Sequence, residues 1–257
     1  MSTIVKRELK PAERLIVAAD FKPDHRKGEN RNSARFQVRM LADKLALTGV
    51  YLKLESNLRG DYNLINDIHS RGLNVMADLK LFGTPETLSA DGRFLRELRP
   101  QIVTVCCAAE VKAMAALKAE LPDTEVLGVT VLTTLDEENA WHTYHGSVLE
   151  AGLRFAQMAL DAKLDGLVSA PAEASRLREV FGNALTINTP NVRPAWASVE
   201  DDDQNPTRVM TPSEAIKAGV DRIVVGRPIL RHQNPYDAVM HIIEEIAIAA
   251  EQSLSAA

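Results

Sequence analysis

The sequence has 257 residues, of which 46% are apolar and 25% are charged, and its formal net charge is −5. This length suits one large α/β domain or two small ones, and the composition is that of an ordinary globular protein. The negative charge argues against general affinity for nucleic acid or for an anionic membrane, although it leaves room for a local basic pocket that binds one phosphate.

Neither the cysteines nor the N-terminal segment points to export from the cell. Cys106 and Cys107 are adjacent in an apolar run and cannot form a disulfide framework. The segment Met1–Arg14 is polar, and no part of the sequence approaches the roughly 20 uninterrupted apolar residues that a membrane-spanning helix needs. We therefore expect a cytoplasmic protein.

Short apolar segments rich in β-branched residues alternate with helical patterns from end to end. Most of these segments are continuously apolar, as expected for parallel strands that are covered on both faces. The predicted strands are Leu15–Asp20, Val50–Leu54, Asn74–Lys80, Ile102–Cys107, Val126–Leu132, Gly166–Ser169, Ala184–Asn188 and Arg222–Val225.

Amphipathic patterns predict a helix after each strand. The seventh of these helices is short, and Thr211-Pro212 before it supplies an N-cap and a proline at the first helical position. The predicted helices are Ser33–Leu47, Leu64–Arg71, Thr87–Leu98, Glu110–Glu120, Ser147–Ala162, Ala172–Phe181, Ser213–Ala218 and Asp237–Glu251.

Eight strand–helix pairs in about 250 residues are typical of the α/β fold called the (β/α)8 or TIM barrel. The alternative is a doubly wound open sheet, which usually has fewer strands and a glycine-rich first turn. No G-x-G-x-x-G pattern follows Leu15–Asp20. We therefore predict a single barrel domain over residues 1–257.

Two loops are longer than usual for a barrel, namely Lys22–Asn32 and Asn191–Met210. The second is polar and follows the seventh strand, beside the place where barrels commonly bind phosphate. It is either a lid over the site or a surface insertion.

The segment Val75–Thr87 carries the most informative pair of charged residues. Asp78 and Lys80 are two residues apart on a predicted strand, so their side chains share one face. In a barrel this face, at the carboxyl end of a strand, is where catalytic residues lie. The alternative is an ordinary ion pair at the surface.

Other strand ends supply polar residues that a barrel would bring to the same mouth. Gly226 lets a ligand approach the backbone closely, and the guanidinium of Arg227 suits phosphate oxygens. The residues at these strand ends are Asp20, Lys53, Thr133, Thr134, Thr189, Pro190, Gly226 and Arg227.

Several motifs resemble those of the orotidine 5′-monophosphate decarboxylase family. The most specific is DDDQNPTRVMTPSEAIKAGVDRIVVGRPI at Asp201–Ile229, which is similar to the family's C-terminal signature. The motifs LIVAAD at Leu15–Asp20, VYLKL at Val50–Leu54 and ADLKLFGTPET at Ala77–Thr87 agree in order and spacing. TVLTTL and TPNVRP, at residues 130–135 and 189–194, match more loosely, and the likeness spans residues 14–245.

The resemblance implies a cofactor-free decarboxylation of orotidine monophosphate to uridine monophosphate in a homodimer with its active site at the subunit interface. It implies no metal. Lys80 would protonate C6, Asp78 would crowd the substrate carboxylate, and Lys53 would link the ribose to these charges. The substrate-binding residues implied are Asp20 and Thr87, Thr134 and Pro190, and the phosphate-binding Gln204, Gly226 and Arg227, with Thr87 reaching the partner's nucleotide.

Three positions depart from the family pattern. Asn191 stands where the family usually has glycine and Thr134 where it usually has serine, and the third departure concerns a charge. The family reads DxKxxDI, in which the second aspartate crosses the dimer interface, whereas this sequence has Gly83 there. Glu86 lies nearby but beyond Pro85, so we do not expect it to substitute. Three readings stay open: a slow decarboxylase, a related Mg²⁺-dependent enzyme of pentulose or hexulose phosphates, and a non-catalytic nucleotide-binding barrel.

Overall fold

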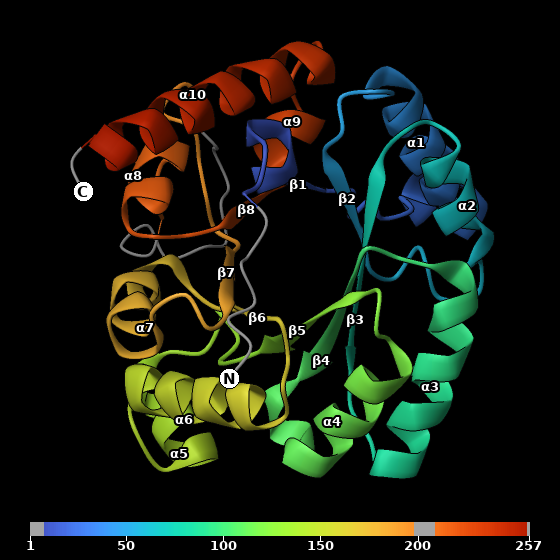
Figure 1. The fold of residues 1–257 in the computed structure, drawn as a ribbon. Coiled ribbons are helices and arrows are strands. Elements are labelled where there is room, and N and C mark those ends of the chain that lie inside the picture. Colours follow the sequence, from blue (N-terminus) through green and yellow to red (C-terminus); the bar gives the residue numbers. More distant parts are fainter. Residues whose placement is uncertain (1–7, 198–208, 256–257) are drawn as a thin grey trace.

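Eight parallel strands form a closed barrel in which each strand pairs with its neighbours in chain order and β1 pairs with β8 (Figure 1). The computed structural model describes residues 8–197 and 209–255. The predicted (β/α)8 barrel is confirmed. Its strands are β1 (Leu15–Ala18), β2 (Tyr51–Leu54), β3 (Asn74–Leu81), β4 (Ile102–Cys106), β5 (Glu125–Val129), β6 (Gly166–Val168), β7 (Thr186–Thr189) and β8 (Arg222–Val225).

Helices cover the outside of the barrel, and each predicted helix is present with shifted ends (Figure 1). They are α1 (Arg31–Lys44), α2 (Asn63–His69), α3 (Pro85–Leu98), α4 (Val111–Glu120), α6 (Val148–Asp161), α7 (Ala174–Phe181), α8 (Pro212–Lys217) and α10 (Pro235–Ser255). None of the helices within residues 8–197 and 209–255 is long and apolar enough to cross a lipid bilayer.

Short helices that we did not predict lie in the loops. The longer ones are α5 (Glu137–Tyr144) and α9 (Arg227–Leu230), and single 3-10 turns occur at Pro11–Arg14, His25–Lys27, Cys107–Ala109 and Pro171–Glu173. Only Ala140 of α5 is buried, so this helix has no apolar stripe that would mark it in the sequence. Its start is fixed instead by Asp136, whose side chain accepts a hydrogen bond from the backbone N–H of Asn139.

The core has two layers, because successive side chains of a strand point to opposite sides of the barrel wall. In β3, Val75, Ala77 and Leu79 belong to the larger layer between the strands and the helices. Met76 belongs to a smaller cluster inside the barrel, with Ile16, Ala18, Tyr51, Ile102, Leu127 and Val224. The same alternation directs Asp78 and Lys80 into the barrel above Met76, as the sequence predicts.

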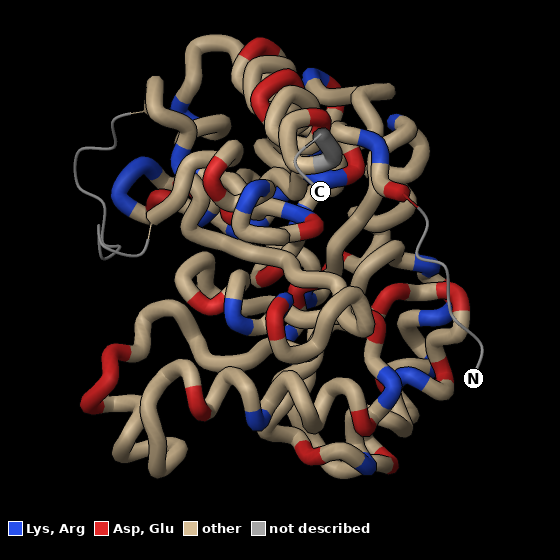
Figure 2. The backbone as a smooth tube through the Cα atoms, turned by 60° about the vertical axis from the view of Figure 1, so that its left-hand side comes forward, with Lys and Arg blue, Asp and Glu red and all other residues tan. Residues whose placement is uncertain are grey.

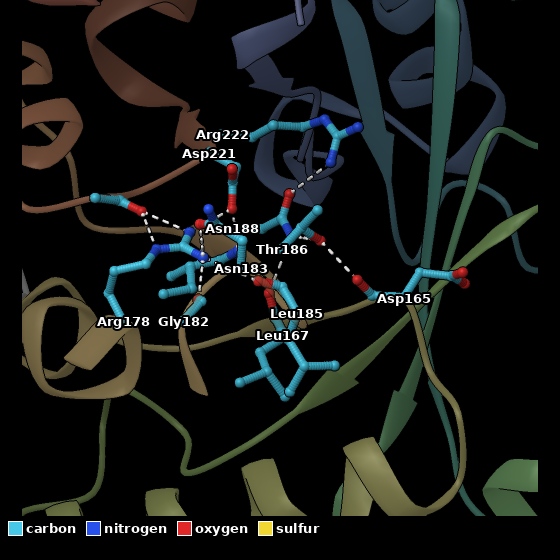
Figure 3. A network of polar contacts seen from close by, with 12 residues as sticks. Asp165, Leu167, Arg178, Gly182, Asn183, Leu185, Thr186, Asn188, Asp221 and Arg222 are labelled. Carbon is cyan, nitrogen blue, oxygen red and sulfur yellow. Dashed lines mark hydrogen bonds and ion pairs between the residues drawn. The ribbon is translucent and has the colours of Figure 1, made fainter. Parts of the chain in front are cut away.

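Acidic and basic residues are interspersed along the described chain (Figure 2), and a polar network closes the amino ends of the strands. Arg222 is only 4% exposed, and its Nη1 and Nη2 lie 3.0 and 2.8 Å from the two carboxylate oxygens of Glu125. Figure 3 shows the adjoining contacts, in which Arg178 lies 2.7 Å from Asp221 and Arg222 donates to Asn188. This end is held by charges that have partners within the barrel.

We predict that Glu125→Ala lowers the free energy of unfolding by about 3–5 kcal/mol, because it leaves the buried guanidinium of Arg222 without its carboxylate. Urea denaturation measures this loss. The control is Glu179→Ala, which breaks the exposed Arg176–Glu179 pair and should cost less than about 1 kcal/mol. Equal losses in the two variants would contradict the prediction.

Candidate active site

A cavity of about 610 Å³ opens at the carboxyl ends of the strands. Its volume is that of a site for one small molecule. The predicted site residues that line this cavity are Asp20, Lys53, Asp78, Lys80, Thr133, Pro190, Gly226 and Arg227. The closed barrel brings these positions together although they span more than 200 residues of sequence.

Four of these residues form a continuous chain of opposite charges. The ammonium of Lys53 lies 2.8 Å from Asp20 Oδ2 and 3.2 Å from Asp78 Oδ2. The same Asp78 oxygen lies 2.8 Å from the ammonium of Lys80. Asp78 therefore holds two lysine ammonium groups side by side at the cavity wall.

A fifth charged residue, Glu55, joins this chain, and sequence reasoning missed it. Its Oε1 lies 3.3 Å from the Lys80 ammonium and its Oε2 lies 3.7 Å from the Lys53 ammonium. Glu55 directly follows β2, two residues after Lys53. That spacing, which places both side chains on one face if the strand conformation continues, was the signal available in the sequence.

The centre of the charge cluster is buried, with Lys53 8% and Asp78 6% exposed. Burial by itself would raise the pKa of Asp78, but the ammonium groups of Lys53 and Lys80 outweigh it and hold this pKa below its ordinary value. Burial would likewise lower the pKa of Lys53, but Asp78 and Asp20 outweigh it and raise this pKa. Asp78 and Lys53 are therefore both charged at neutral pH.

The backbone at Lys80 is strained. Its φ angle is +48°, a left-handed conformation that costs free energy in a residue with a side chain, and the pairing of β3 with β4 changes register between Ala77 and Leu81. The backbone N–H of Lys80 donates to the Thr104 hydroxyl at 2.9 Å, and that hydroxyl donates to Asp78 Oδ1 at 2.9 Å. Thr104, which is fully buried in β4, thus holds both members of the Asp78–Lys80 pair.

Further positive side chains line the cavity after β1, β7 and β8, which are neighbouring strands of the barrel, and they are Lys22, Arg193, Arg227 and Arg231. Arg227 begins α9, directly after Gly226. A Cβ atom on Gly226 would lie 3.4 Å from the Cβ of Ala18, so the protein itself has room for one. What glycine adds here is access of a ligand to the backbone from the cavity.

The other predicted site residues either do not line the cavity or lie outside the residues that the structure describes. Thr134 is exposed, and it is its neighbour Thr133 that lines the cavity. Thr87 is exposed in the first turn of α3, with its hydroxyl 3.0 Å from that of Thr84. Gln204 and most of the second long loop lie outside the described residues, although Val192 and Met210 pair near the ends of that loop.

Ser169, directly after β6, is a further cavity residue that sequence reasoning did not select as a candidate. It lines the cavity and its side chain is fully buried. Within residues 8–197 and 209–255 its hydroxyl has no hydrogen-bond partner. A buried hydroxyl usually has a partner, so Ser169 is a candidate to bind a polar atom of a ligand.

We predict that Thr104→Val lowers the free energy of unfolding by about 1–3 kcal/mol, because it leaves the Lys80 N–H and one Asp78 oxygen without a partner. Thr104→Ser keeps the hydroxyl and loses one methyl group, so it should be the more stable of the two variants. Urea denaturation of both variants measures the difference. A serine variant less stable than the valine variant would show that packing of the methyl group matters more than the hydrogen bonds.

Comparisons with known proteins agree on one family. A sequence model of the orotidine 5′-phosphate decarboxylase / HUMPS family matches residues 13–242. An orotidine 5′-phosphate decarboxylase of Nitrobacter winogradskyi is 34% identical over 238 residues, which are 92% of this chain and 94% of that protein. One from Staphylococcus aureus strain Newman is 38% identical over 188 residues, 71% of this chain and 80% of that protein.

Solved structures show the same fold. A crystal structure of orotidine 5′-phosphate decarboxylase from Lactobacillus acidophilus superposes with a TM-score of 0.73 at 23% sequence identity, covering 91% of this chain and 99% of that one. The family match extends over the strands that carry the charge cluster and over β8 with Arg227. The chain belongs to the orotidine 5′-phosphate decarboxylase / HUMPS family.

Proposed function

We propose that this protein is an orotidine 5′-phosphate decarboxylase of pyrimidine biosynthesis in the cytoplasm, which converts orotidine monophosphate to uridine monophosphate with Lys80 as the proton donor. The observation that carries the proposal is the position of the Lys80 ammonium. It lies 2.8 Å from the buried Asp78 in a cavity whose wall also holds Arg227. The curated relatives at 34% and 38% identity carry this name.

The reaction needs a cation at the carbon that loses carbon dioxide. When the C6–carboxylate bond breaks, its electron pair stays on C6, where the pyrimidine ring offers no electron sink. A fixed ammonium stabilises this developing charge and then transfers a proton to C6, and the neutral amine regains a proton from water. The place of Lys80 in the cavity wall at the mouth of the barrel supports this role, and these steps use no metal or organic cofactor.

Asp78 has two roles in this proposal. It orients the Lys80 ammonium through the 2.8 Å contact, and as a buried anion it crowds the substrate carboxylate, which favours loss of carbon dioxide. Lys53 links this pair to Asp20, with contacts of 3.2 and 2.8 Å. We assign Asp20 and Lys53 to the ribose hydroxyls.

The phosphate group would bind at the basic part of the wall. Arg227 suits phosphate oxygens, Gly226 leaves its backbone open to the cavity, and Gln204, outside the described residues, is our candidate in the lid. Pro190 and Thr134 are assigned to the pyrimidine side. Because this binding is remote from C6, its free energy can be used to order the site.

A homodimer is part of the proposal, with Thr87 reaching the partner's nucleotide. Phe82 and Leu132, which follow β3 and β5 at the cavity end of the barrel, are 67% and 45% exposed, as expected of an interface that is uncovered in a single chain. We also propose that Gly83 stands where the family pattern DxKxxD has its second aspartate. The partner subunit would then supply no carboxylate from this position.

We predict that the wild-type protein consumes orotidine monophosphate, and the loss of absorbance of the orotate chromophore measures this reaction. Lys80→Ala should lower kcat by at least about 100-fold, because it removes the general acid. Lys112→Ala, on the exposed face of α4, is the control and should keep the wild-type rate. A folded wild-type protein that binds uridine monophosphate in calorimetry without turnover would instead be a non-catalytic nucleotide-binding barrel.

A second variant tests the assignment of Arg227 to the phosphate group. Arg227→Ala should raise KM by roughly tenfold or more with a smaller effect on kcat, since a charge-assisted hydrogen bond contributes about 1.5–3 kcal/mol. Arg176→Ala, which removes an exposed arginine of α7, should leave KM unchanged. An Arg227→Ala variant with the wild-type KM would remove Arg227 from the phosphate site.

We predict that sedimentation equilibrium gives twice the mass of the 28.2 kDa chain, and that Phe82→Asp shifts the mass toward that of one chain. A charged side chain at Phe82 would lose its solvent when the two surfaces meet, which weakens association. A wild-type mass of one chain at the concentrations of the activity assay would overturn the dimer.

A further inference from the structure

We propose that Glu55 is the second carboxylate that holds the Lys80 ammonium, and that it acts as a positioning residue for the proton transfer to C6. This inference rests on the proposed function for its catalytic part. Its structural part, the bridge from Glu55 to both lysines, stands on the geometry of the site.

The bridge joins the two lysines through separate oxygens of one carboxylate. Glu55 Oε1 lies 3.3 Å from Lys80 and Oε2 lies 3.7 Å from Lys53. Asp78 joins the same two lysines from the other side, through one oxygen at 2.8 and 3.2 Å. The four residues therefore form a closed ring in which each ammonium contacts both carboxylates.

The ring fixes the direction of a side chain that would otherwise be mobile. The Lys80 side chain is 31% exposed, and a lysine held at one contact can still rotate about its stem. An ammonium has three N–H donors. The hydrogen bond to Asp78 and the ion pair with Glu55 hold the ammonium from two sides, which leaves its remaining side for the reacting carbon. Loss of Glu55 removes one of the two contacts that define this direction.

Glu55 also sets the net charge of the cluster within one chain. Asp20, Glu55 and Asp78 carry three negative charges, and Lys53 and Lys80 carry two positive ones, all within contact distances of 3.7 Å or less. Gly83 brings no carboxylate. With Glu55 the cluster keeps one excess negative charge to oppose the substrate carboxylate, and without it the cluster is neutral.

Glu55 does not line the cavity, so it acts through Lys80 rather than on the substrate. Glu86 is the competing candidate, because it lies three residues after Gly83. It is exposed in the first turn of α3, and none of the ion pairs among the described residues includes it. The two glutamates make a matched pair for mutation, since each change removes one negative charge near the site.

The test compares Glu55→Gln, Glu55→Asp and Glu86→Gln in the full-length protein. Glu55→Gln should lower kcat by roughly 10- to 100-fold, which is less than the roughly 100- to 1,000-fold lost with a donor that touches the reacting atoms, because Glu55 acts through Lys80. KM should stay within about threefold and the thermal midpoint should be nearly unchanged, because Glu55 does not touch substrate. Glu55→Asp keeps the charge on a shorter stem and should recover part of the rate, whereas Glu86→Gln should behave as wild type.

A wild-type kcat in Glu55→Gln would overturn the proposal. The same holds if Glu86→Gln reproduces the loss, or if Glu55→Gln changes KM and the thermal midpoint together with kcat, since these results point to another anion or to a merely structural role.

A second measurement separates this inference from the proposed reaction. Lysine Nζ signals can be followed by NMR in protein with 15N-labelled lysine, and Lys53→Arg and Lys80→Arg assign the two signals. Glu55→Gln should shift both signals and Glu86→Gln neither. If the wild-type protein shows no turnover, the proposed function fails, while shifted signals still support the bridge. Signals that are unchanged in Glu55→Gln would overturn the inference whatever the activity.

Discussion

The site depends on one constraint, which is that buried charges must be paired. Asp78 and Lys53 are almost completely removed from water, and each would lose several kcal/mol of solvation if it stood alone. Each is charged because the other is present, and Lys80, Asp20 and Glu55 extend the same pairing toward the cavity. A cluster of this kind keeps its geometry, because displacing Asp78 or Lys53 would take an ion-pair partner from each of its neighbours.

The barrel contains paired charges at both ends of its strands. At the carboxyl ends of the strands the charges border a cavity and can meet a ligand. At the amino ends, Arg222 and Glu125 are paired beneath the inner apolar layer and serve to close the barrel. Buried ion pairs thus border the cavity at one end and close the barrel at the other, and the inner apolar layer separates the two groups of charges.

The strained backbone of Lys80 is held by contacts of the same site. A left-handed lysine is unfavourable in isolation, yet its N–H and its charged partner are both held by Thr104. Strained residues persist where the surrounding contacts over-determine them, and such positions are frequent at functional sites. In this protein the strain lies at the residue that we assign to proton transfer, whose ammonium contacts Asp78 and Glu55.

The sequence was enough to predict the barrel, because eight continuous apolar segments alternating with amphipathic ones leave few other folds. It also determined that Asp78 and Lys80 lie together and that Arg227 follows the last strand, since both follow from local spacing. The other contacts of the site depend on how the strands pair in the closed barrel. Glu55 reaches Lys80, and Thr104 reaches Asp78, across neighbouring strands whose register no local pattern specifies. The segment Val75–Thr87 looked incomplete at Gly83 because the second carboxylate that contacts Lys80, that of Glu55, lies outside it, directly after β2. Contacts between neighbouring strands are fixed by closure of the barrel rather than by sequence spacing.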